Sequence, residues 1–372
     1  MAREGQQTSE SLLAQAQDNI PSSGDHVATS DIPARDTVVP GEVTSTAIAS
    51  LHIGGTTTGR AKALIIRVLN SSLVGAALIA LVVVFSVASS HFLSSTNVET
   101  IFDSVAVIAV LTIGQVFVII TAGIDLSQGA VIALTGVVGA QMMSSGDVLV
   151  GIIVALAVGL AVGMFNGVLT AFTRVPAFIV TLGTLSIAGG VALLDTGGEP
   201  IYQLPSAMSN FGTRSFWIFP YIIIVTIILA VIMQALLLFS RFGRSIYAIG
   251  SNRRAALLSG LPVRRNTVAV YVISGLMSAI GGILLTAYVN SALPTAGADY
   301  ELDAIAAVVI GGGSLFGGQG TIWAAMLGAL LLSVLSNGTE LLGVSTYAET
   351  VILGGVVIGA VFIDSFRRRV AV

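Results

Sequence analysis

Long apolar runs alternate with short polar or glycine-bearing segments over most of the chain. The runs lie at about 73–88, 101–122, 130–143, 148–172, 177–194, 221–238 and 268–288, with further apolar stretches up to 364. A helix needs about 20 consecutive apolar residues to cross a hydrocarbon core of about 30 Å. The pattern therefore predicts an all-α, polytopic integral membrane protein with about eight to ten transmembrane helices, some of them broken or re-entrant.

Residues 1–62 follow a different pattern, because they are polar and irregular and carry scattered Gly, Ser, Thr, Asp and Pro. The first ten residues, MAREGQQTSE, lack the apolar core of a signal peptide. A segment with so little apolar surface cannot offset its ordering entropy. We expect a disordered cytoplasmic tail at 1–62 and a transmembrane domain at 63–372.

The composition excludes several kinds of partner and site. The chain is 55% hydrophobic and 9% charged, against about 25% charged residues in soluble domains. A net charge of −3 gives no reason to expect nucleic acid as a partner. With no cysteine and only His26, His52 and His91 as histidines, no zinc-ligand spacing is present. We expect neither a metal nor a cofactor.

The distribution of basic residues predicts the orientation, because Lys and Arg gather in cytoplasmic loops. By this rule both termini are cytoplasmic, and the long loop at 195–217, with Arg214 as its one basic residue, faces outward. The basic positions assigned to the cytoplasm are Arg60, Lys62, Arg67, Arg174, the six arginines of 241–265, and Arg367, Arg368 and Arg369.

The loop at 241–265 contains the signals of a short helix. Ser251 or Asn252 can cap its start, and Gly260 can close it ahead of Pro262. A helix of two turns is marginal in water, so an ordered one needs an external support. Ala255 and Ala256 are small, as expected where a helix lies in a groove on another protein. The alternative is a solvated loop that only obeys the positive-inside rule.

ATP hydrolysis by Walker chemistry is excluded by the sequence. That chemistry needs a lysine after a glycine-rich loop, and the only lysine, Lys62, has no such loop before it. The glycine clusters at 311–313 and 317–318 interrupt an apolar stretch instead of following a strand, so they are not a dinucleotide site. We expect a protein that is not an enzyme.

Two glycine-bearing interruptions, 123–129 and 311–320, fall in the two halves of the membrane region, and each ends in Gln-Gly. Paired interrupted segments indicate a translocation pathway between repeats. The candidate pathway or broken-helix residues are Gly123, Asp125, Ser127, Gln128, Glu301, Asp303, Gly313, Ser314 and Gln319.

Acidic residues lie within or beside the spans, where a charge costs roughly 2.5–3.5 kcal/mol on insertion scales. One interpretation is that they bind substrate hydroxyls or relay protons. The other is that Asp125 and Asp303 cap broken helix ends, and it is favoured because Asp125 sits at a break. The acids concerned are Asp103, Asp125, Glu301, Asp303, Glu340 and Glu349.

Five stretches together resemble the permease subunits of ribose-type sugar ABC importers, in that family's order over about 70–365. They are GIDLSQGAVIAL at 123–134, LGT at 182–184, the loop at 241–265, PTAGADYELDAIAAVVIGGGSLFGGQGT at 294–321, and NGTELLGVS at 337–345.

The resemblance implies an inner-membrane permease domain at 63–372 that moves a monosaccharide by alternating access. Its implied partners are a separate cytoplasmic ATPase, an extracytoplasmic sugar-binding protein, membrane lipid and a second permease copy, with a homodimer favoured. It also implies a coupling contact with the ATPase through Gly250, Asn252, Arg253, Ala255, Ala256, Ser259 and Gly260. Arg253 and Arg254 depart from the family, which often has acidic or polar residues there.

Alternatives remain open on the sequence alone. A branched-chain amino acid or nucleoside ABC permease would have the same architecture. A proton-coupled sugar carrier could use Asp103, Asp125 or Glu301. A structural scaffold is disfavoured, because it gives no reason for paired broken helices.

Overall fold

The computed structural model describes residues 74–145, 147–202 and 204–371. The expected tail at 1–62, together with Arg60, Lys62 and Arg67, lies outside these residues. All described residues belong to one compact unit, Thr56–Val372.

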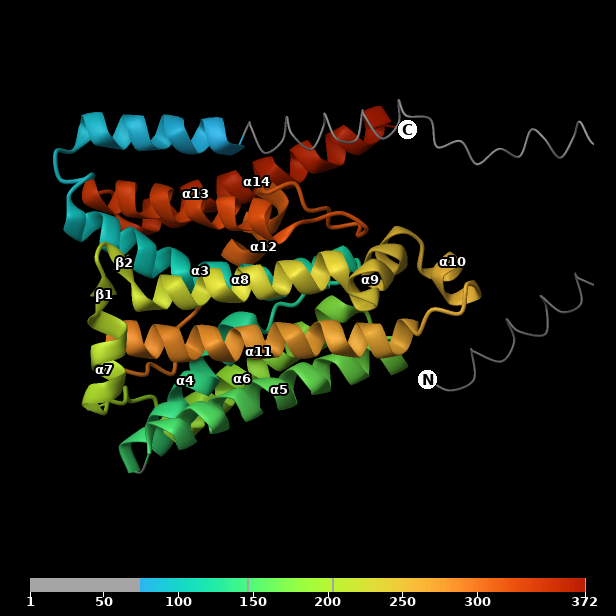
Figure 1. Ribbon diagram of the computed structural model, residues 1–372, viewed down its shortest axis with the longest axis horizontal. Coiled ribbons are helices and arrows are strands. Elements are labelled where there is room, and N and C mark those ends of the chain that lie inside the picture. Colours follow the sequence, from blue (N-terminus) through green and yellow to red (C-terminus); the bar gives the residue numbers. More distant parts are fainter. Residues whose placement is uncertain (1–73, 146, 203, 372) are drawn as a thin grey trace, which may run out of the picture. The chain divides into compact units, whose positions relative to one another are not determined.

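Six helices of the described part are long and apolar enough to cross a membrane (Figure 1). They are α3 (Ser95–Ile120), α5 (Val148–Phe172), α6 (Ala177–Thr196), α8 (Tyr221–Phe239), α11 (Val263–Val289) and α13 (Ile322–Leu341). Three shorter apolar helices are Val74–Ala88, α4 (Gln128–Ser145) and the first part of α14 (Thr346–Ala371). The prediction of an all-α polytopic membrane protein is confirmed.

Short elements join these spans, and most of them were not predicted. The loop expected at 195–217 contains α7 (Ser206–Thr213) and runs into a hairpin of β1 (Ser215–Phe216) and β2 (Phe219–Pro220). Its turn holds Trp217 at φ 60°. Strands of two residues have no alternating pattern long enough to recognise, which explains the omission. The remaining short helices are α9 (Arg241–Ser251), α10 (Arg253–Leu258) and α12 (Tyr300–Ile310).

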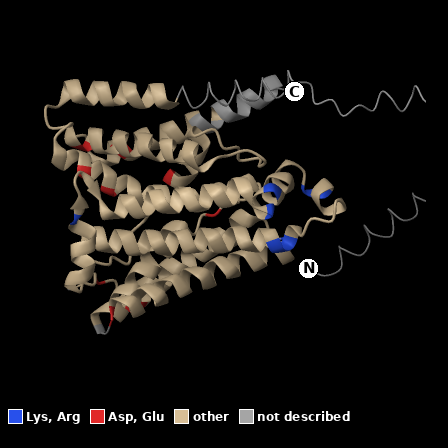
Figure 2. Cartoon of the chain, in the orientation of Figure 1, with Lys and Arg blue, Asp and Glu red and all other residues tan. Residues whose placement is uncertain are grey.

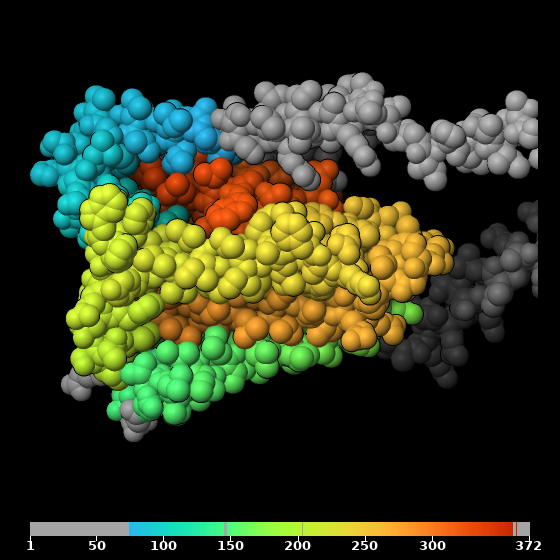
Figure 3. Space-filling model, viewed as in Figure 1, coloured from blue at the N-terminus to red at the C-terminus, as the bar shows by residue number. Residues whose placement is uncertain are grey.

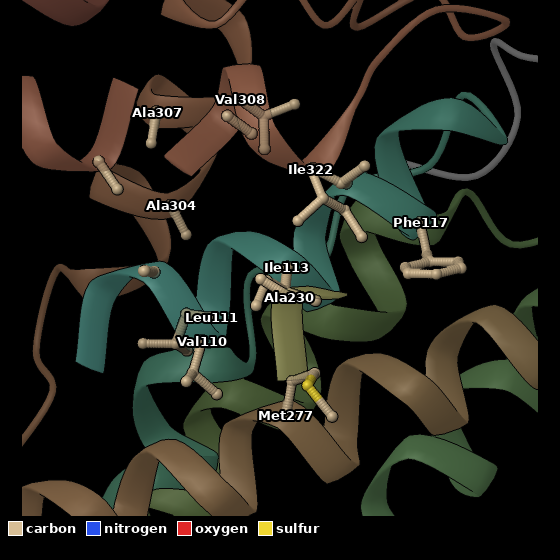
Figure 4. Close-up of a cluster of buried hydrophobic side chains, with 14 of the residues drawn as sticks. Val110, Leu111, Ile113, Phe117, Ala230, Met277, Ala304, Ala307, Val308 and Ile322 are labelled. Atoms are coloured by element: carbon tan, nitrogen blue, oxygen red, sulfur yellow. The ribbon is translucent and has the colours of Figure 1, made fainter. Parts of the chain in front are cut away.

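Helix α3 forms the centre of the fold, with 83% of its most apolar window buried, against 22% for α5. It packs against α8, α11, α12 and α13. Figure 4 shows Val110, Leu111, Ile113 and Phe117 of α3 among side chains from α8, α11, α12 and α13. A span surrounded by other helices can be apolar on every face, as this one is.

Helix α11 packs lengthwise on α5 because one face of α5 carries small residues. Gly159, Gly163 and Gly167 recur every four residues and so lie on one helix face. A Cβ at Gly163 would lie 2.5 Å from the carbonyl oxygen of Tyr271, and one at Gly167 would lie 2.8 Å from the Cα of Val268. Small residues at this spacing let two helix backbones approach closely in a membrane.

The outer faces of the spans are apolar, as lipid requires. In Figure 3, α8 runs across the visible face with α11 beside it. Exposed side chains on α8 include Ile228, Val231 and Ile232. Figure 2 shows that the described Lys and Arg residues gather at the end of the molecule that carries α9 and α10. Arg214 is the exception, because it caps the end of α7, which lies at the opposite end in Figure 1.

Candidate functional site

The first glycine-bearing interruption is a true break between two helices. Helix α3 ends at Ile120 and α4 begins at Gln128. The chain turns at Ala122, whose φ is 61°, a value unfavourable for a residue with a Cβ. The hydroxyl of Tyr271 lies so close to Gly123 that an added Cβ would be 2.7 Å from it. A side chain at position 123 would therefore displace Tyr271.

Asp125 lies inside this break and accepts hydrogen bonds on both carboxylate oxygens. Its Oδ1 accepts from the backbone N–H of Ser127 at 3.0 Å and from the Ser127 hydroxyl at 2.6 Å. Its Oδ2 accepts from the hydroxyl of Ser274 on α11 at 2.7 Å. The bond from the Ser127 N–H holds the carboxylate at the first turn of α4. This geometry favours the capping interpretation of Asp125 over substrate binding or a proton relay.

The network continues into α5 and α6. The amide of Asn166 donates to the Ser127 hydroxyl at 2.9 Å, and the Thr184 hydroxyl donates to Asn166 Oδ1 at 2.6 Å. On the other side, Gln128 donates from Nε2 to the Ser274 hydroxyl at 2.9 Å and to the Leu111 carbonyl at 3.2 Å. The polar side chains of this network are at most 4% exposed. They tie the break to α3, α5, α6 and α11.

Three members of this buried network, Asn166, Thr184 and Ser274, were not predicted as site residues. Each is a polar residue within a long apolar run, and Thr184 also lies in the LGT stretch that resembles the permease family. Isolated Ser and Thr residues in membrane helices commonly bond to their own backbone. The signal does not say which of them face another helix.

The second acidic group lies at the start of α12. Glu301 is buried, whereas Asp303 is only partly buried. A Cβ at Gly129 would lie 2.2 Å from Glu301 Oε2, so the Glu301 carboxylate sits against the first turn of α4. The first break thus meets the start of α12 through Glu301. Of the other acids, Asp103 and Glu349 are half-buried, Glu340 is exposed, and Glu349 accepts a hydrogen bond from the Ser336 hydroxyl.

The second interruption runs from Gly311 to the start of α13. Gly313 and Ser314 are buried, and the Ser314 N–H donates to the Gln319 carbonyl at 3.2 Å. The Gln319 side chain is exposed, whereas Gln128 is fully buried in the other break. The two Gln-Gly pairs therefore occupy different environments.

Helix α9 packs its C-terminal end against both breaks at once. A Cβ at Gly250 would lie 1.7 Å from the Ile120 carbonyl oxygen and 2.6 Å from the Gly318 nitrogen. The Gly318 N–H donates to that Ile120 carbonyl at 2.8 Å. The Tyr247 hydroxyl donates to the Gly320 carbonyl at 2.6 Å. We call this contact of α9 with Ile120 and 318–320 the junction.

The arginine-rich loop contains the predicted short helix, α10, and its caps are as expected. Asn252 supplies the cap, since its side chain accepts from the Ala255 N–H at 2.9 Å. The Ser251 hydroxyl instead donates to the Tyr247 carbonyl. Gly260 has φ 77°. The preceding helix α9 was not predicted.

One residue of this loop is oriented differently from the interpretation of the sequence. Ala256 is 5% exposed and packs with Ile249 and Val263 inside the loop. The exposed side chains of α10 include Leu257 at 63% and Leu258 at 82%. Ala255 and Ser259 are also exposed. The outward surface of α10 is thus apolar at its end and basic at its start, where Arg253 and Arg254 are exposed.

Within the described residues, no cluster of three or more His, Asp or Glu side chains could hold a metal ion. The polar groups of the site are carboxylates, amides and hydroxyls, most of them bonded to one another, although Gln128 Oε1 is buried without a hydrogen-bond partner in the described part of the chain. Their arrangement holds broken helices together. The same kinds of group are the donors and acceptors that a hydroxylated molecule offers, but this network is closed to solvent.

Comparison with known proteins identifies a matching family and several similar permeases. Residues 97–363 match the family described as "Branched-chain amino acid transport system / permease component". The ribose import permease protein RbsC of Bacillus subtilis (strain 168) is 44% identical over 287 residues, which cover 76% of this chain and 89% of that protein.

Two further relatives are named for other sugars. The D-allose transport system permease protein AlsC of Escherichia coli (strain K12) is 37% identical, over 75% of this chain and 86% of its own length. The galactose/methyl galactoside import permease protein MglC of Haemophilus influenzae is 34% identical, over 74% of this chain and 88% of its own. No solved structure matches the chain.

Proposed function

The chain belongs to the branched-chain amino acid transport system / permease component family, and we propose that it is the membrane subunit of an ABC importer for a monosaccharide. The relatives described above are permeases named for ribose, allose and galactose. The amino acid alternative is supported by the family's description but by none of these relatives.

The observation that carries the mechanism is the junction between α9 and the two breaks. Backbone meets backbone there, with glycine at positions 250 and 318. Close-packed groups transmit displacement directly, because no flexible side chain lies between them to absorb it. A separate ATPase that moves α10 would therefore shift the ends of α3 and of the second break together. Such a shift would open one side of the membrane and close the other.

The partners follow from the same proposal. The ATPase binds the exposed surface of α10, with Leu257, Leu258 and the arginines as contacts. An extracytoplasmic sugar-binding protein delivers substrate at the opposite end, near α7. A second copy of the chain packs on an exposed apolar face. Helix α6 offers such an open face, because no other atom lies within 4 Å of a Cβ added at Gly183 or Gly190. Lipid covers the rest.

The experiment uses the chain reconstituted in vesicles with its ATPase and binding protein, and follows uptake of ribose, allose and galactose. We expect uptake of at least one sugar that requires internal ATP and persists when a protonophore collapses the proton gradient. The chain purified alone should hydrolyse no ATP, since no lysine follows a glycine-rich loop.

Uptake that stops with the protonophore at constant internal ATP would instead identify a proton-coupled carrier. ATP hydrolysis by the purified chain, lost on substitution of its own residues, would contradict the assignment to a non-enzymatic subunit.

A further inference from the structure

We propose that the cavity between α4, α11 and the segment 291–300 holds one sugar ring during transport, an inference that rests on the proposed function. The cavity has a volume of about 140 Å³. Its walls come from the first turns of α4, the last turns of α11 and the segment that leads into α12. Figure 1 places these parts away from the arginine-rich loop.

The size fits a single ring. A protein cavity of about 150 Å³ holds one molecule of benzene, a six-membered carbon ring. A monosaccharide is larger by its exocyclic hydroxyls, which would extend through the open side of the cavity. The room is created by glycines at 136, 282 and 297 in the wall. At Gly136 an added Cβ would lie 2.7 Å from the Thr286 Oγ1, so a larger residue there would close the cavity against its own wall.

The polar groups of the wall are hydroxyls without protein partners. Thr286, Ser291 and Tyr300 line the cavity, and within the described residues no side-chain hydrogen bond is formed by any of the three. Thr267 and Ser278 of the same helix differ, because each donates to the carbonyl four residues earlier. Their oxygens are open to the cavity, so a bound polar molecule can take the place of water as their hydrogen-bond partner.

The remaining wall is apolar, with Ile132, Leu285, Val289 and Leu293. A sugar ring presents C–H surface as well as hydroxyls, and pockets for such ligands combine an apolar lining with a few placed polar groups. No charged side chain lines the cavity. A zwitterionic amino acid would leave its ammonium and carboxylate unpaired in this cavity, which costs more than leaving a hydroxyl unpaired.

The cavity is also joined to the breaks. Ile132 lies in the first turns of α4, and an added Cβ at Gly297 would be 2.9 Å from the Gly129 carbonyl oxygen. The Glu301 carboxylate sits against the same turn. A shift of the first break would therefore change the cavity's shape, which is how a site of this kind would take up and release its ligand.

The test first establishes which of ribose, allose and galactose the wild-type importer takes up in vesicles, and uses that sugar as the probe. Thr286→Val removes a hydroxyl with little change in volume, and Ala296→Leu fills the cavity. We expect Thr286→Val to lower the maximal uptake rate about tenfold and Ala296→Leu to abolish uptake. The amount of ATPase that co-purifies with the permease should stay unchanged in both.

Two matched control variants show whether a loss of uptake comes from the cavity or from a change in folding. Thr267→Val makes the same change in α11 at a hydroxyl bonded to its own helix, and Ala298→Leu makes the same change at an exposed position two residues from Ala296. Both should transport normally. If Thr286→Val and Ala296→Leu both take up the sugar at the wild-type rate, the cavity proposal is wrong, while the proposed function is unaffected. Absence of any sugar uptake by the wild type would overturn the proposed function.

Discussion

Asp125 shows how a buried carboxylate is held when no described Lys or Arg side chain forms an ion pair with it. Its two oxygens accept hydrogen bonds from hydroxyl and N–H donors of Ser127 and Ser274. Those donors are themselves bonded onward to Asn166 and Gln128. Buried polar networks are stable only when their members are satisfied, so a change at one position is felt by its neighbours.

The Asp125→Asn variant tests this at the residue scale. The new amide places N–H groups where the carboxylate accepted hydrogen bonds, so at least one buried donor loses its acceptor. We expect a loss of about 1–3 kcal/mol in the free energy of unfolding, measured as a lower unfolding midpoint of the detergent-solubilised protein. The control is Asp147→Asn, an exposed N-cap where asparagine caps equally well. An unchanged midpoint in Asp125→Asn would contradict the role given to the network.

At the scale of elements, α10 is held by the rest of its loop and not by a partner alone. Ala256 packs with Ile249 and Val263, which anchors two turns of helix that would be marginal in isolation. Ala256→Glu would therefore disturb the loop itself and could not test docking. The residues that face outward are better suited to that purpose.

Leu258→Glu is the corresponding test of docking. Leu258 is 82% exposed, so the substitution leaves the permease folded but places a charge on the proposed ATPase contact. We expect normal permease abundance, loss of uptake and weaker co-purification of the ATPase. Leu342→Glu, an exposed leucine that follows α13, is the matched control and should retain the ATPase. If Leu258→Glu co-purifies the ATPase as well as the control does, α10 is not the docking element.

At the scale of the whole molecule, the junction joins chain positions that are far apart in sequence. Ile120, Gly250 and Gly318 meet with backbone atoms in contact. The loop that would receive force from an ATPase and the breaks that would respond to it are thus adjacent. A displacement of the loop can therefore reach the breaks directly, without a series of intermediate residues.

Gly250→Ala tests the junction. The new methyl group would overlap the Ile120 carbonyl oxygen, at 1.7 Å, so α9 must move away from the breaks. We expect uptake to fall by at least about tenfold, because even small misplacement of a functional constellation is costly, while the ATPase still co-purifies. Gly75→Ala, where no atom lies within 4 Å of the added Cβ, should transport normally. Undiminished uptake in Gly250→Ala would show that the junction does not carry the coupling.

The sequence predicted a large part of the fold and a smaller part of the site. The predicted span at 148–172 coincides with α5, and Asn252, Gly260 and Pro262 correctly bounded the short helix α10. Caps and apolar runs are local signals, because each depends only on residues that are close together in the sequence. The hairpin at 215–220 and the helix α9 were missed, because each depends on neighbours that the local pattern does not name.

The sequence by itself determined that this chain is a membrane protein of several helices, because burial in lipid depends on the length and apolarity of each segment. It also determined that both interruptions exist, since glycines and acids inside apolar runs weaken a continuous helix. Only the tertiary structure decided that the Asp125 carboxylate faces Ser274, that Ala256 points inward, and that Gly250 fits between the two breaks. Such contacts depend on how helices distant in the chain pack side by side, and that packing is a property of all of them together.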